Sequence, residues 1–391
     1  MAPVPILMLG QGVKLGGFLA LLGLGACSAG AQAPADGPRA ALETALERYR
    51  ALAAGPELRP PFTRSVIRPA SAHADAASLR RYLVALGDLP ASPPVSPAAD
   101  TLYGGDLVDA IRRFQQRHAL VADGVIGPAT MRALRVPLAH RARQLELAAE
   151  RWDAVPRTAG GRFLVVNVPA FRLYAFDGDG AADRPVVRMN VIVGTAGSGS
   201  TPVFSGTMRE VVFQPYWDVP PGIARRELVP AIRRDPGYLE REHLEIVHGG
   251  DHDAVRYPPI AENLDRVIRG SLRLRQRPGP WNSLGDVKLL FPNRFNVYLH
   301  GTPAQELFAA TRRDFSHGCI RIEDPVALTA WVMRAEGWDR AAVLAAMHDG
   351  PMSRRVVLRQ PIAVHVIYST AVVADDGRVH FYADVYGHDT R

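Results

Sequence analysis

A histidine and a cysteine 19 positions apart, His300 and Cys319, carry the clearest chemical signal in this sequence. The pattern predicts that His300 ends a strand and that a helix after it brings the chain back to Cys319. A cysteine beside a histidine can form a thiolate–imidazolium pair, and a thiolate is a nucleophile near neutral pH. The histidine can take up the proton and return it to a leaving amine. The pair is therefore a candidate for covalent acyl transfer.

Cys319 closes the short motif Ser316-His317-Gly318-Cys319, and Arg321 follows two residues later. Gly318 lets the backbone bend, so that N–H groups near Cys319 could face a developing oxyanion. His317 has either a part in that pocket or a purely structural role.

Other interpretations of these residues stay open. A lone cysteine is by default an inert thiol in a core. His300, His317 and Cys319 could ligate zinc, but a structural zinc site needs four protein ligands and no fourth one stands out. The loop His248–Asp253 holds histidines and aspartates, yet in a glycine-rich loop these are more often solvated turn residues. The sequence therefore predicts no metal site and no cofactor.

The segments that must position this pair predict a mostly-β unit over residues 160–337. Segments rich in β-branched and aromatic residues, bounded by Gly, Pro and Asp, predict strands. These are Phe163–Val168, Phe171–Phe176, Val186–Val193, Met208–Phe213, Val287–Phe291 and Phe295–His300. Between the fourth and fifth lies a helical, proline-punctuated insertion, residues 217–285. It is too long for a passive loop, so we expect a cap or lid over a site.

Helix start signals stand on either side of the cysteine motif. Thr302-Pro303-Ala304-Gln305 is a capping box with proline at the first helical position. Asp324 and Pro325 open a second helix, Val326–Glu336, in the same style. The segment 338–391 is expected to add a C-terminal helix and edge strands, because apolar residues alternate over Val356–Tyr386.

The chain before residue 160 has helical periodicity. Helices are predicted over Arg39–Ala53, Ser78–Leu86, Leu107–His118, a short segment ending at Leu134, and Pro137–Trp152. Asp106 is the expected N-cap of the third of these. The turn Asp123–Thr130 precedes the short helix. We expect a helical scaffold, 39–77 plus 137–158, around a small three-helix domain, 78–136, and an α+β fold for the whole chain.

The composition fits two or three folded units and argues against a nucleic-acid partner. The 391 residues are 47% hydrophobic, which is too apolar for a largely disordered chain. The net charge of +7 comes almost entirely from scattered arginine, since lysine occurs only at Lys14 and Lys288. A nucleic-acid footprint would be clustered and interleaved with aromatics. A mildly basic surface remains compatible with an anionic polymer.

The N-terminus has the pattern of an export signal. The apolar run Leu15–Ala26 is too short for a membrane span and predicts the core of a signal peptide over residues 1–26. Leu24-Gly25-Ala26-Cys27 resembles a bacterial lipobox, in which the cysteine takes a lipid, and residues 27–38 would form a tether. A plain secretory signal with a chance cysteine is the alternative. Lipidation at Cys27 would leave Cys319 without a disulfide partner.

The motif around the cysteine resembles the active site of the L,D-transpeptidases (YkuD-type catalytic domain). That family's motif is a histidine, about fifteen residues, and then Ser/Thr-His-Gly-Cys; here Gly301–Phe315 spans the fifteen. The turn Asp123–Thr130 resembles that of a three-helix peptidoglycan-binding domain. Trp217–Leu228 and Phe291–Pro303 resemble the cap and the catalytic approach of the large, YcbB-like branch. The resemblance therefore implies an α+β enzyme with a scaffold, a wall-binding unit and a capped catalytic domain.

Carried over residue by residue, the resemblance implies roles for the motif residues. Cys319 would be the nucleophile, His300 the general base, and the Gly301 carbonyl would orient the imidazole. The other implied contacts are an oxyanion pocket shaped by Ser316, His317 and Gly318, a groove lined by Tyr298, a stem-peptide carboxylate held by Arg321, and a weaker substrate contact at Trp217. No metal and no cofactor is implied.

The implied reaction is 3→3 cross-linking of peptidoglycan stem peptides through a thioester on Cys319, with release of terminal D-alanine. Water as acceptor would make a carboxypeptidase, and a protein lysine would make an anchoring enzyme. A catalytically silent wall-binding scaffold is the alternative of another class. Tetrapeptide donors, a second stem as acceptor and possible glycan-synthesis enzymes are the expected partners. The expected location is the periplasm or cell envelope, with a lipid anchor in the outer membrane.

Overall fold

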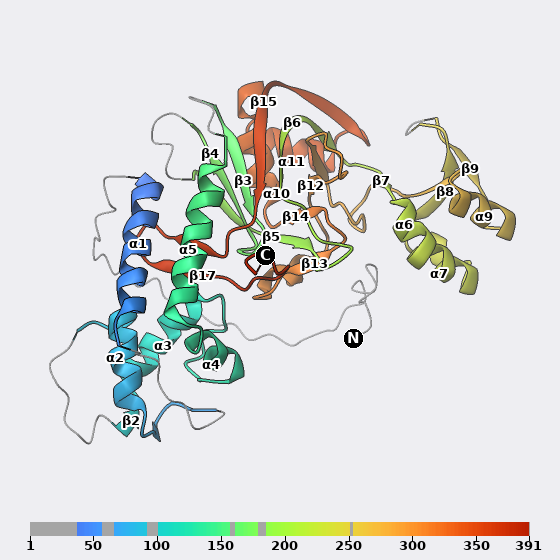
Figure 1. Cartoon of the computed structure of the whole chain (residues 1–391). Helices are drawn as coiled ribbons and strands as arrows, with labels where there is room; N and C mark the ends of the chain where they lie inside the picture. Colours follow the sequence, from blue (N-terminus) through green and yellow to red (C-terminus); the bar gives the residue numbers. More distant parts are fainter. Residues whose placement is uncertain are drawn as a thin grey trace.

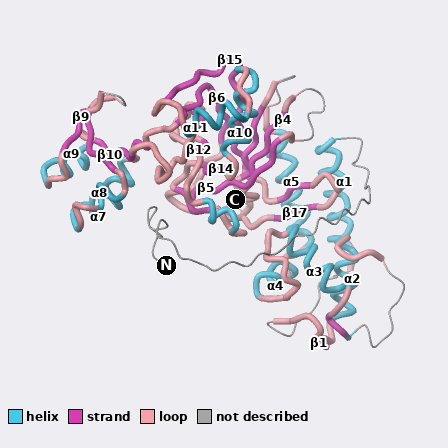
Figure 2. Tube along the Cα trace, turned by 180° about the vertical axis from the view of Figure 1, so that it is seen from behind, coloured by secondary structure: helices cyan, strands magenta, loops and turns pink. Residues whose placement is uncertain are grey.

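The computed structural model describes residues 37–56, 66–91, 101–156, 161–178, 185–250 and 253–390. A helical unit, a strand-rich barrel and a small lobe follow one another across the molecule (Figure 1), and the view from behind shows the same order (Figure 2). The predicted signal peptide, Cys27 and most of the tether lie outside the described residues. Within the described part, no helix is long and apolar enough to span a membrane.

The helical unit is built on two long helices that lie side by side, α1 (Gly37–Ala54) and α5 (Leu138–Asp153) (Figure 1). The shorter helices are α2 (Ala76–Leu86), α3 (Asp106–Arg117) and α4 (Pro128–Leu134), and β1 (Ser71–Ala72) pairs with β2 (Leu102–Tyr103). Their apolar faces meet in one core, in which Leu107, Ile111 and Phe114 of α3 are almost fully buried. The helical periodicity of α3 is therefore confirmed.

The start of α3 differs from the prediction. The helix begins at Asp106 itself, and Gly105, at φ +52°, precedes it. The Asp106 carboxylate accepts two hydrogen bonds from the Arg80 guanidinium, at 2.7 and 3.1 Å, and no side-chain cap bond forms at this helix start. An ion pair with α2 has taken the place of the cap.

The strand-rich part is a sheet that closes on itself. Its strands are β3 (Phe163–Asn167), β4 (Arg172–Phe176), β5 (Val187–Gly194), β6 (Phe204–Phe213), β11 (Val287–Leu290), β12 (Leu299–His300), β13 (Asp314–Ser316), β14 (Ile320–Ile322) and β15 (Arg354–Ile367). Their order is β13-β5-β14-β12-β11-β6-β15-β3-β4, and β4 pairs again with β5. This last pairing closes the strands from β5 round to β4 into a barrel, and β13 is added beside the end of β5.

Two helices share the barrel's apolar core. They are α10 (Pro325–Met333), extended by a 3-10 turn over Arg334–Glu336, and α11 (Arg340–His348). The Asp324 carboxylate accepts a hydrogen bond from the Ala327 N–H at 2.9 Å, so the predicted cap at this helix is confirmed.

Two predictions within the barrel were wrong in length. The strand expected over Phe295–His300 is only Leu299–His300, because the Asn293 side chain bonds the backbone of Phe295 and Val297 and holds a turn in which Asn296 has φ +55°. The helix expected after Thr302 is a single 3-10 segment, Gln305–Ala309. There the Gln305 amide donates to the Thr302 carbonyl, not back to its N–H as a capping box requires.

The sequence had indicated that the C-terminal strands are edge strands of the barrel, and this prediction was wrong. β15 lies inside the sheet, antiparallel to β6 and parallel to β3. The last two strands, β16 (Ala371–Val373) and β17 (Val379–Phe381), form a hairpin whose side chains enter the core of the helical unit. The chain's end therefore ties the two parts together.

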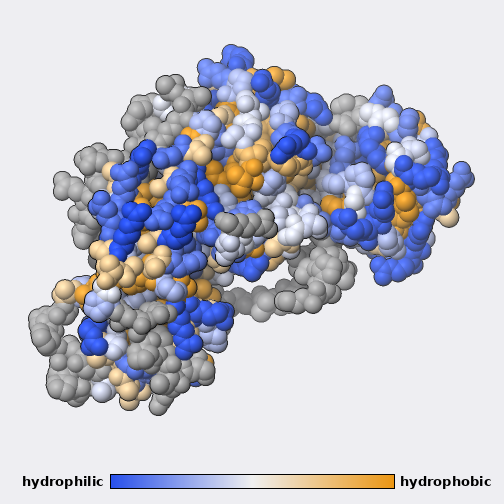
Figure 3. All heavy atoms as spheres, viewed as in Figure 1, coloured by the Kyte–Doolittle hydropathy of each residue, from blue (hydrophilic) through white to orange (hydrophobic). Residues whose placement is uncertain are grey.

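The insertion between β6 and β11 forms the separate lobe, with a largely hydrophilic surface (Figure 3). Its helices are α6 (Pro221–Ile223), α7 (Val229–Arg234), α8 (Tyr238–Arg241) and α9 (Ala261–Arg269), with a π-helical turn, Ala224–Leu228, joining the first two. The lobe also holds an antiparallel sheet of β7 (Trp217–Asp218), β8 (Leu244–His248), β9 (Val255–Tyr257) and β10 (Arg273–Gln276). The predicted cap is thus part helix and part sheet, with its own apolar core. We call residues 217–285 the cap.

Candidate active site

The candidate residues stand on two neighbouring parallel strands. β12 pairs with β14 so that Leu299 lies opposite Ile320 and His300 opposite Arg321. Leu299 and Ile320 are fully buried in the barrel core. Tyr298 stands just before β12 and Cys319 just before β14. Because side chains alternate along an extended chain, we expect Tyr298 and His300 to share the opposite face of the sheet with Cys319 and Arg321. The strand pairing thus brings four predicted residues together.

The backbone sets the tautomer of His300. Its Nδ1 lies 2.6 Å from the Gly301 carbonyl oxygen, so Nδ1 carries the hydrogen and Nε2 is left as the proton acceptor. Gly285, the last residue of the cap, has φ +61° and lies close to the backbone of Gly301 and Thr302. A Cβ on Gly285 would lie 2.7 Å from the Thr302 nitrogen, so only glycine allows this approach. The Gly301 N–H donates to the Val287 carbonyl at 3.1 Å. The candidate base is therefore held by main-chain contacts.

Burial keeps the imidazole neutral. It lowers the pKa of His300 to about 3, and the positive charges of Arg321 and Lys288 act in the same direction, against the hydrogen bond to Gly301. His300 is only 4% exposed. At neutral pH the imidazole is therefore unprotonated, so its Nε2 can accept a proton.

Burial also raises the pKa of the Cys319 thiol, opposed by hydrogen bonding to Tyr298 and by the charges of Lys288 and Arg321. The Cys319 Sγ lies 3.7 Å from the Asn296 carbonyl oxygen. With the pKa of the thiol raised and that of the imidazole lowered, the resting pair is neutral. This differs from the thiolate–imidazolium pair expected from the sequence, because the sequence does not show how deeply both groups are buried.

The loop before Cys319 is held from the barrel side. The Ser316 Oγ donates to the Cys319 carbonyl at 2.5 Å and accepts from the Gly318 N–H at 3.1 Å. The Thr201 hydroxyl donates to the Gly318 carbonyl at 2.8 Å. Gly318 has φ +117°, a conformation that side chains rarely adopt. The Gly318 N–H is therefore engaged by Ser316 in this structure and does not point at an open oxyanion position.

Close backbone approach supports this loop. A Cβ on Gly194 would lie 1.8 Å from the Gly199 carbonyl oxygen and 2.9 Å from the Gly318 Cα. The Thr201 hydroxyl also accepts from the Gly194 N–H at 2.9 Å. The end of β5 thus packs directly under the cysteine loop.

The cap reaches the site at two points. The Nε2 of His317, beside the nucleophile, lies 2.9 Å from the Glu227 Oε1 of the π-helical turn. Tyr298 packs against the apolar core of the cap as well as against that of the barrel. Trp217 lies in the apolar core of the cap and is 5% exposed.

Sequence reasoning missed Lys288 and Glu227. Lys288 lies opposite His300 on β11, and its Nζ is 4.2 Å from the centre of the Tyr298 ring. Its signal was present, since it is one of two lysines and lies between the buried Val287 and Leu289. Glu227 had no comparable signal, because only folding brings the cap helix to the cysteine loop.

The described residues contain no group of three or more His, Cys, Asp or Glu side chains placed to hold a metal ion. Part of the loop His248–Asp253 lies outside the described residues, so the metal interpretation there is not tested.

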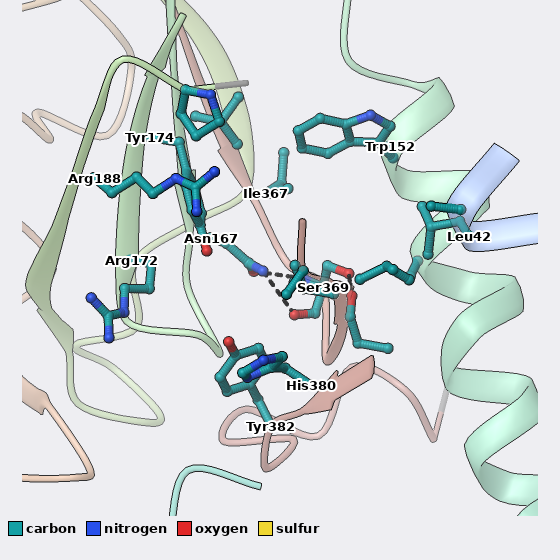
Figure 4. Close-up of a pocket in the computed structure, with 18 of the residues that line it drawn as sticks. Leu42, Trp152, Asn167, Arg172, Tyr174, Arg188, Ile367, Ser369, His380 and Tyr382 are labelled. Carbon is teal, nitrogen blue, oxygen red and sulfur yellow. Dashed lines mark hydrogen bonds between the residues drawn. The ribbon is translucent and has the colours of Figure 1, made fainter. Parts of the chain in front are cut away.

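A cavity of about 410 Å³ lies elsewhere, between the helical unit and the barrel (Figure 4). Trp152 and Leu42 line it from the helices, and Tyr174 and Ile367 line it from the barrel. None of the residues that line it belongs to the cysteine site.

Comparison with known proteins identifies the family of the chain. Residues 161–357 match the family model of the L,D-transpeptidase catalytic domain (YkuD). Residues 72–134 match the model described as "Putative peptidoglycan binding domain". A protein of Haemophilus influenzae named "Putative L,D-transpeptidase" is 30% identical over 254 residues, which are 63% of this chain and 48% of that protein. The chain thus spans about half the length of this curated relative.

A solved structure is also similar in part. It is titled a fused Zn-dependent amidase/peptidase/peptidoglycan-binding domain-containing protein, from Clostridium acetobutylicum. The match has 13% identity and a TM-score of 0.22, and it covers 77% of this chain and 98% of that one. Likeness at this level adds nothing to the assignment, which rests on the catalytic-domain match. The chain belongs to the L,D-transpeptidase (YkuD) family, with a peptidoglycan-binding domain before its catalytic domain.

Proposed function

We propose that this protein is a cell-wall cysteine L,D-transpeptidase that forms 3→3 peptidoglycan cross-links through a thioester on Cys319. The observation that carries the proposal is the pairing of β12 with β14, which puts His300 and Cys319 on one face of adjacent strands. The Gly301 carbonyl at 2.6 Å leaves His300 Nε2 as the acceptor. Family membership supplies the reaction class.

In the first step, the Cys319 sulfur attacks the carbonyl carbon of the third residue of a tetrapeptide stem. The thiol proton passes to His300 Nε2 as the bond between sulfur and carbon forms, since the neutral pair makes His300 a general base. The bond between that carbon and the nitrogen of D-alanine then breaks, and His300 returns the proton to the leaving amine. The products are a thioester and free D-alanine.

In the second step, the side-chain amine of a neighbouring stem attacks the thioester. His300 takes the amine's proton, and the sulfur leaves and is reprotonated as Cys319. Gly318 and Ser316 hold the loop during both steps. Because the Gly318 N–H is engaged by Ser316, we assign the oxyanion contact to the next N–H along, that of Cys319.

The charges around the pair suit an acidic donor. Arg321 lies opposite His300 on one side and Lys288 on the other. Guanidinium and ammonium groups bind carboxylates, so Arg321 would hold a stem-peptide carboxylate with Lys288 nearby. Tyr298 would line the groove between them. Trp217, in the core of the cap, stays the weaker proposal for a substrate contact.

Two alternatives use the same thioester: water as acceptor gives an L,D-carboxypeptidase, and a protein lysine gives an anchoring enzyme. A catalytically silent wall-binding scaffold is the alternative without chemistry, and the domain matched over residues 72–134 is the observation that favours it.

The first experiment is intact-protein mass spectrometry of the full chain after incubation with a carbapenem, beside Cys319→Ala. A mass increase of one drug on the parent and none on the variant is expected. No adduct on the folded parent would leave the wall-binding scaffold as the better proposal. Digested sacculi incubated with the enzyme then separate the acceptors, since cross-linked dimers, trimmed tripeptides and stem-linked protein are different products.

We also propose that the protein is exported and anchored to the outer membrane by lipid on Cys27. The lipobox-like sequence Leu24–Cys27 supports this. Labelled palmitate should enter the parent and not Cys27→Ala. Label in both proteins, or in neither, would contradict the anchor.

A further inference from the structure

We infer that Glu227 of the cap is a positioning residue for the cysteine loop, which it holds through its hydrogen bond to His317. The inference rests on the proposed function, because it concerns how the cap assists the same thiol. Glu227 is not placed to touch the reacting atoms. It acts on the residue two positions before Cys319.

The contact is direct, and it joins two bodies with separate cores. The Glu227 Oε1 accepts from the His317 Nε2 at 2.9 Å, with the two side chains 33% and 37% exposed. Glu227 belongs to the cap core through its neighbours Ala224 and Leu228, which are 4% exposed, whereas His317 belongs to the barrel. The bond therefore crosses from cap to barrel beside the nucleophile.

The local helix geometry aims Glu227 at the loop. Residues 224–228 form a π-helical turn between α6 and α7, and such turns are frequent at functional sites. Ala224, Leu228 and Val229 point into the cap core, while Arg225 and Arg226 are exposed. The side of the lobe that carries α6 faces the barrel (Figure 1).

The cysteine loop is contacted by the barrel on one side and by the cap on the other. From the barrel, Thr195 donates its N–H to the Ser316 carbonyl at 2.9 Å and Thr201 donates to the Gly318 carbonyl. These contacts hold the residues before and after His317 from the barrel side. The His317 side chain is held by Glu227 of the cap. Together these contacts hold the three residues before Cys319.

A second contact joins the cap to the segment that carries His300. Tyr298, two residues before His300, packs against the cap core. The cap thus touches the strand of the base through Tyr298 and the loop of the nucleophile through Glu227. The cap therefore contacts both segments that carry the candidate pair.

The test compares Glu227→Ala and Glu227→Gln with the parent in single-turnover acylation by a carbapenem and in steady-state turnover of a tetrapeptide donor. Loss of one partly exposed charged hydrogen bond should lower the acylation rate of Glu227→Ala about fivefold. The fall should appear in kcat with KM little changed. Glu227→Gln should keep most of the rate, because its amide oxygen can still accept from His317.

Two controls separate positioning from general damage. Glu240→Gln changes another exposed cap carboxylate, paired with Arg277 at 3.0 Å, and should leave the rate unchanged. His317→Ala combined with Glu227→Ala should be no slower than His317→Ala alone, because both changes remove one interaction. Thermal unfolding of each variant checks that the fold is kept.

Three outcomes would overturn the inference: an unchanged rate in Glu227→Ala, additive losses in the double variant, or a faster rate in Glu227→Ala. The last would make the bond a latch that opposes acylation. Each is distinct from failure of the proposed function, since in that case the parent itself would not be acylated.

Discussion

The barrel and the cap hold the active site by different means. The barrel uses main-chain pairing: β12 against β14 sets the faces of His300 and Cys319, and a carbonyl sets the histidine tautomer. The cap uses side chains, with one hydrogen bond from Glu227 and the packing of Tyr298. His300 and Cys319 are the proposed reacting groups, whereas the cap residues act through other residues. The chemistry should therefore depend strongly on that pair and only by degrees on the cap residues.

With the nucleophile left in place, the largest effect should come from the base. His300→Ala removes the acceptor that Nε2 provides, and general-base catalysis is typically worth about 10²–10⁴-fold. We expect acylation by a carbapenem to slow by that range while the thermal unfolding curve stays close to the parent's. Acylation at more than a tenth of the parent's rate would mean that another group takes the proton.

A change under the cysteine loop should reduce stability as well as rate. Gly194→Ala would put a Cβ 1.8 Å from the Gly199 carbonyl oxygen, a contact that only backbone movement can relieve. Overpacking of this kind lowers the free energy of unfolding by about 1–3 kcal/mol, measured by urea denaturation. Gly127→Ala is the matched control, because it has open space and an ordinary φ of −90°. Equal stability of the two variants would contradict the packing described for β5.

The pH dependence tests whether the barrel keeps the pair neutral. His300 has a pKa of about 3, so acylation should stay level through pH 6.5, where an ordinary histidine takes up a proton. The fall in acylation rate on the acid side (the acid limb) should appear only near the lowered pKa of His300. In Arg321→Gln, one charge that lowers the pKa of His300 is gone, so the limb should move to higher pH.

The carbapenem acylation rate measured across pH for both proteins decides this. A limb near 6.5 in the parent would show that the imidazole is more solvated than its burial indicates. A limb that stays in place in Arg321→Gln would remove Arg321 as a cause.

The same contrast explains what could be predicted from the sequence. Most barrel strands follow from segments rich in β-branched and aromatic residues, and the Ser316–Cys319 motif with His300 points to the pair. The short strands β13 and β14 beside the cysteine were not predicted. The cap sheet was missed because β8 and β10 carry charged residues that are nevertheless buried. Glu245 and Arg275 pair there at 2.9 Å, and a buried ion pair resembles surface charge in a sequence.

Other features depend on contacts between distant segments. The position of β15 inside the sheet comes from parallel pairing with β3, about 200 residues earlier, which no local pattern encodes. The contact of Glu227 with His317 spans 90 positions. The neutral state of the pair also depends on burial, which the motif alone does not specify.

The smallest effect should come from Lys288, which stands in the barrel but acts through its side chain, as the cap residues do. Its Nζ lies over the Tyr298 ring at 4.2 Å, and its charge lowers the pKa of the Cys319 thiol. Replacing it with methionine keeps the length of the chain and removes the charge, so KM for an acidic tetrapeptide donor should rise about threefold. Lys288→Arg should restore most of the affinity, and added salt should narrow the gap between parent and Lys288→Met. A loss above a hundredfold in kcat would place Lys288 with His300 and Cys319. It would contradict the view that residues outside this pair change the rate only by degrees.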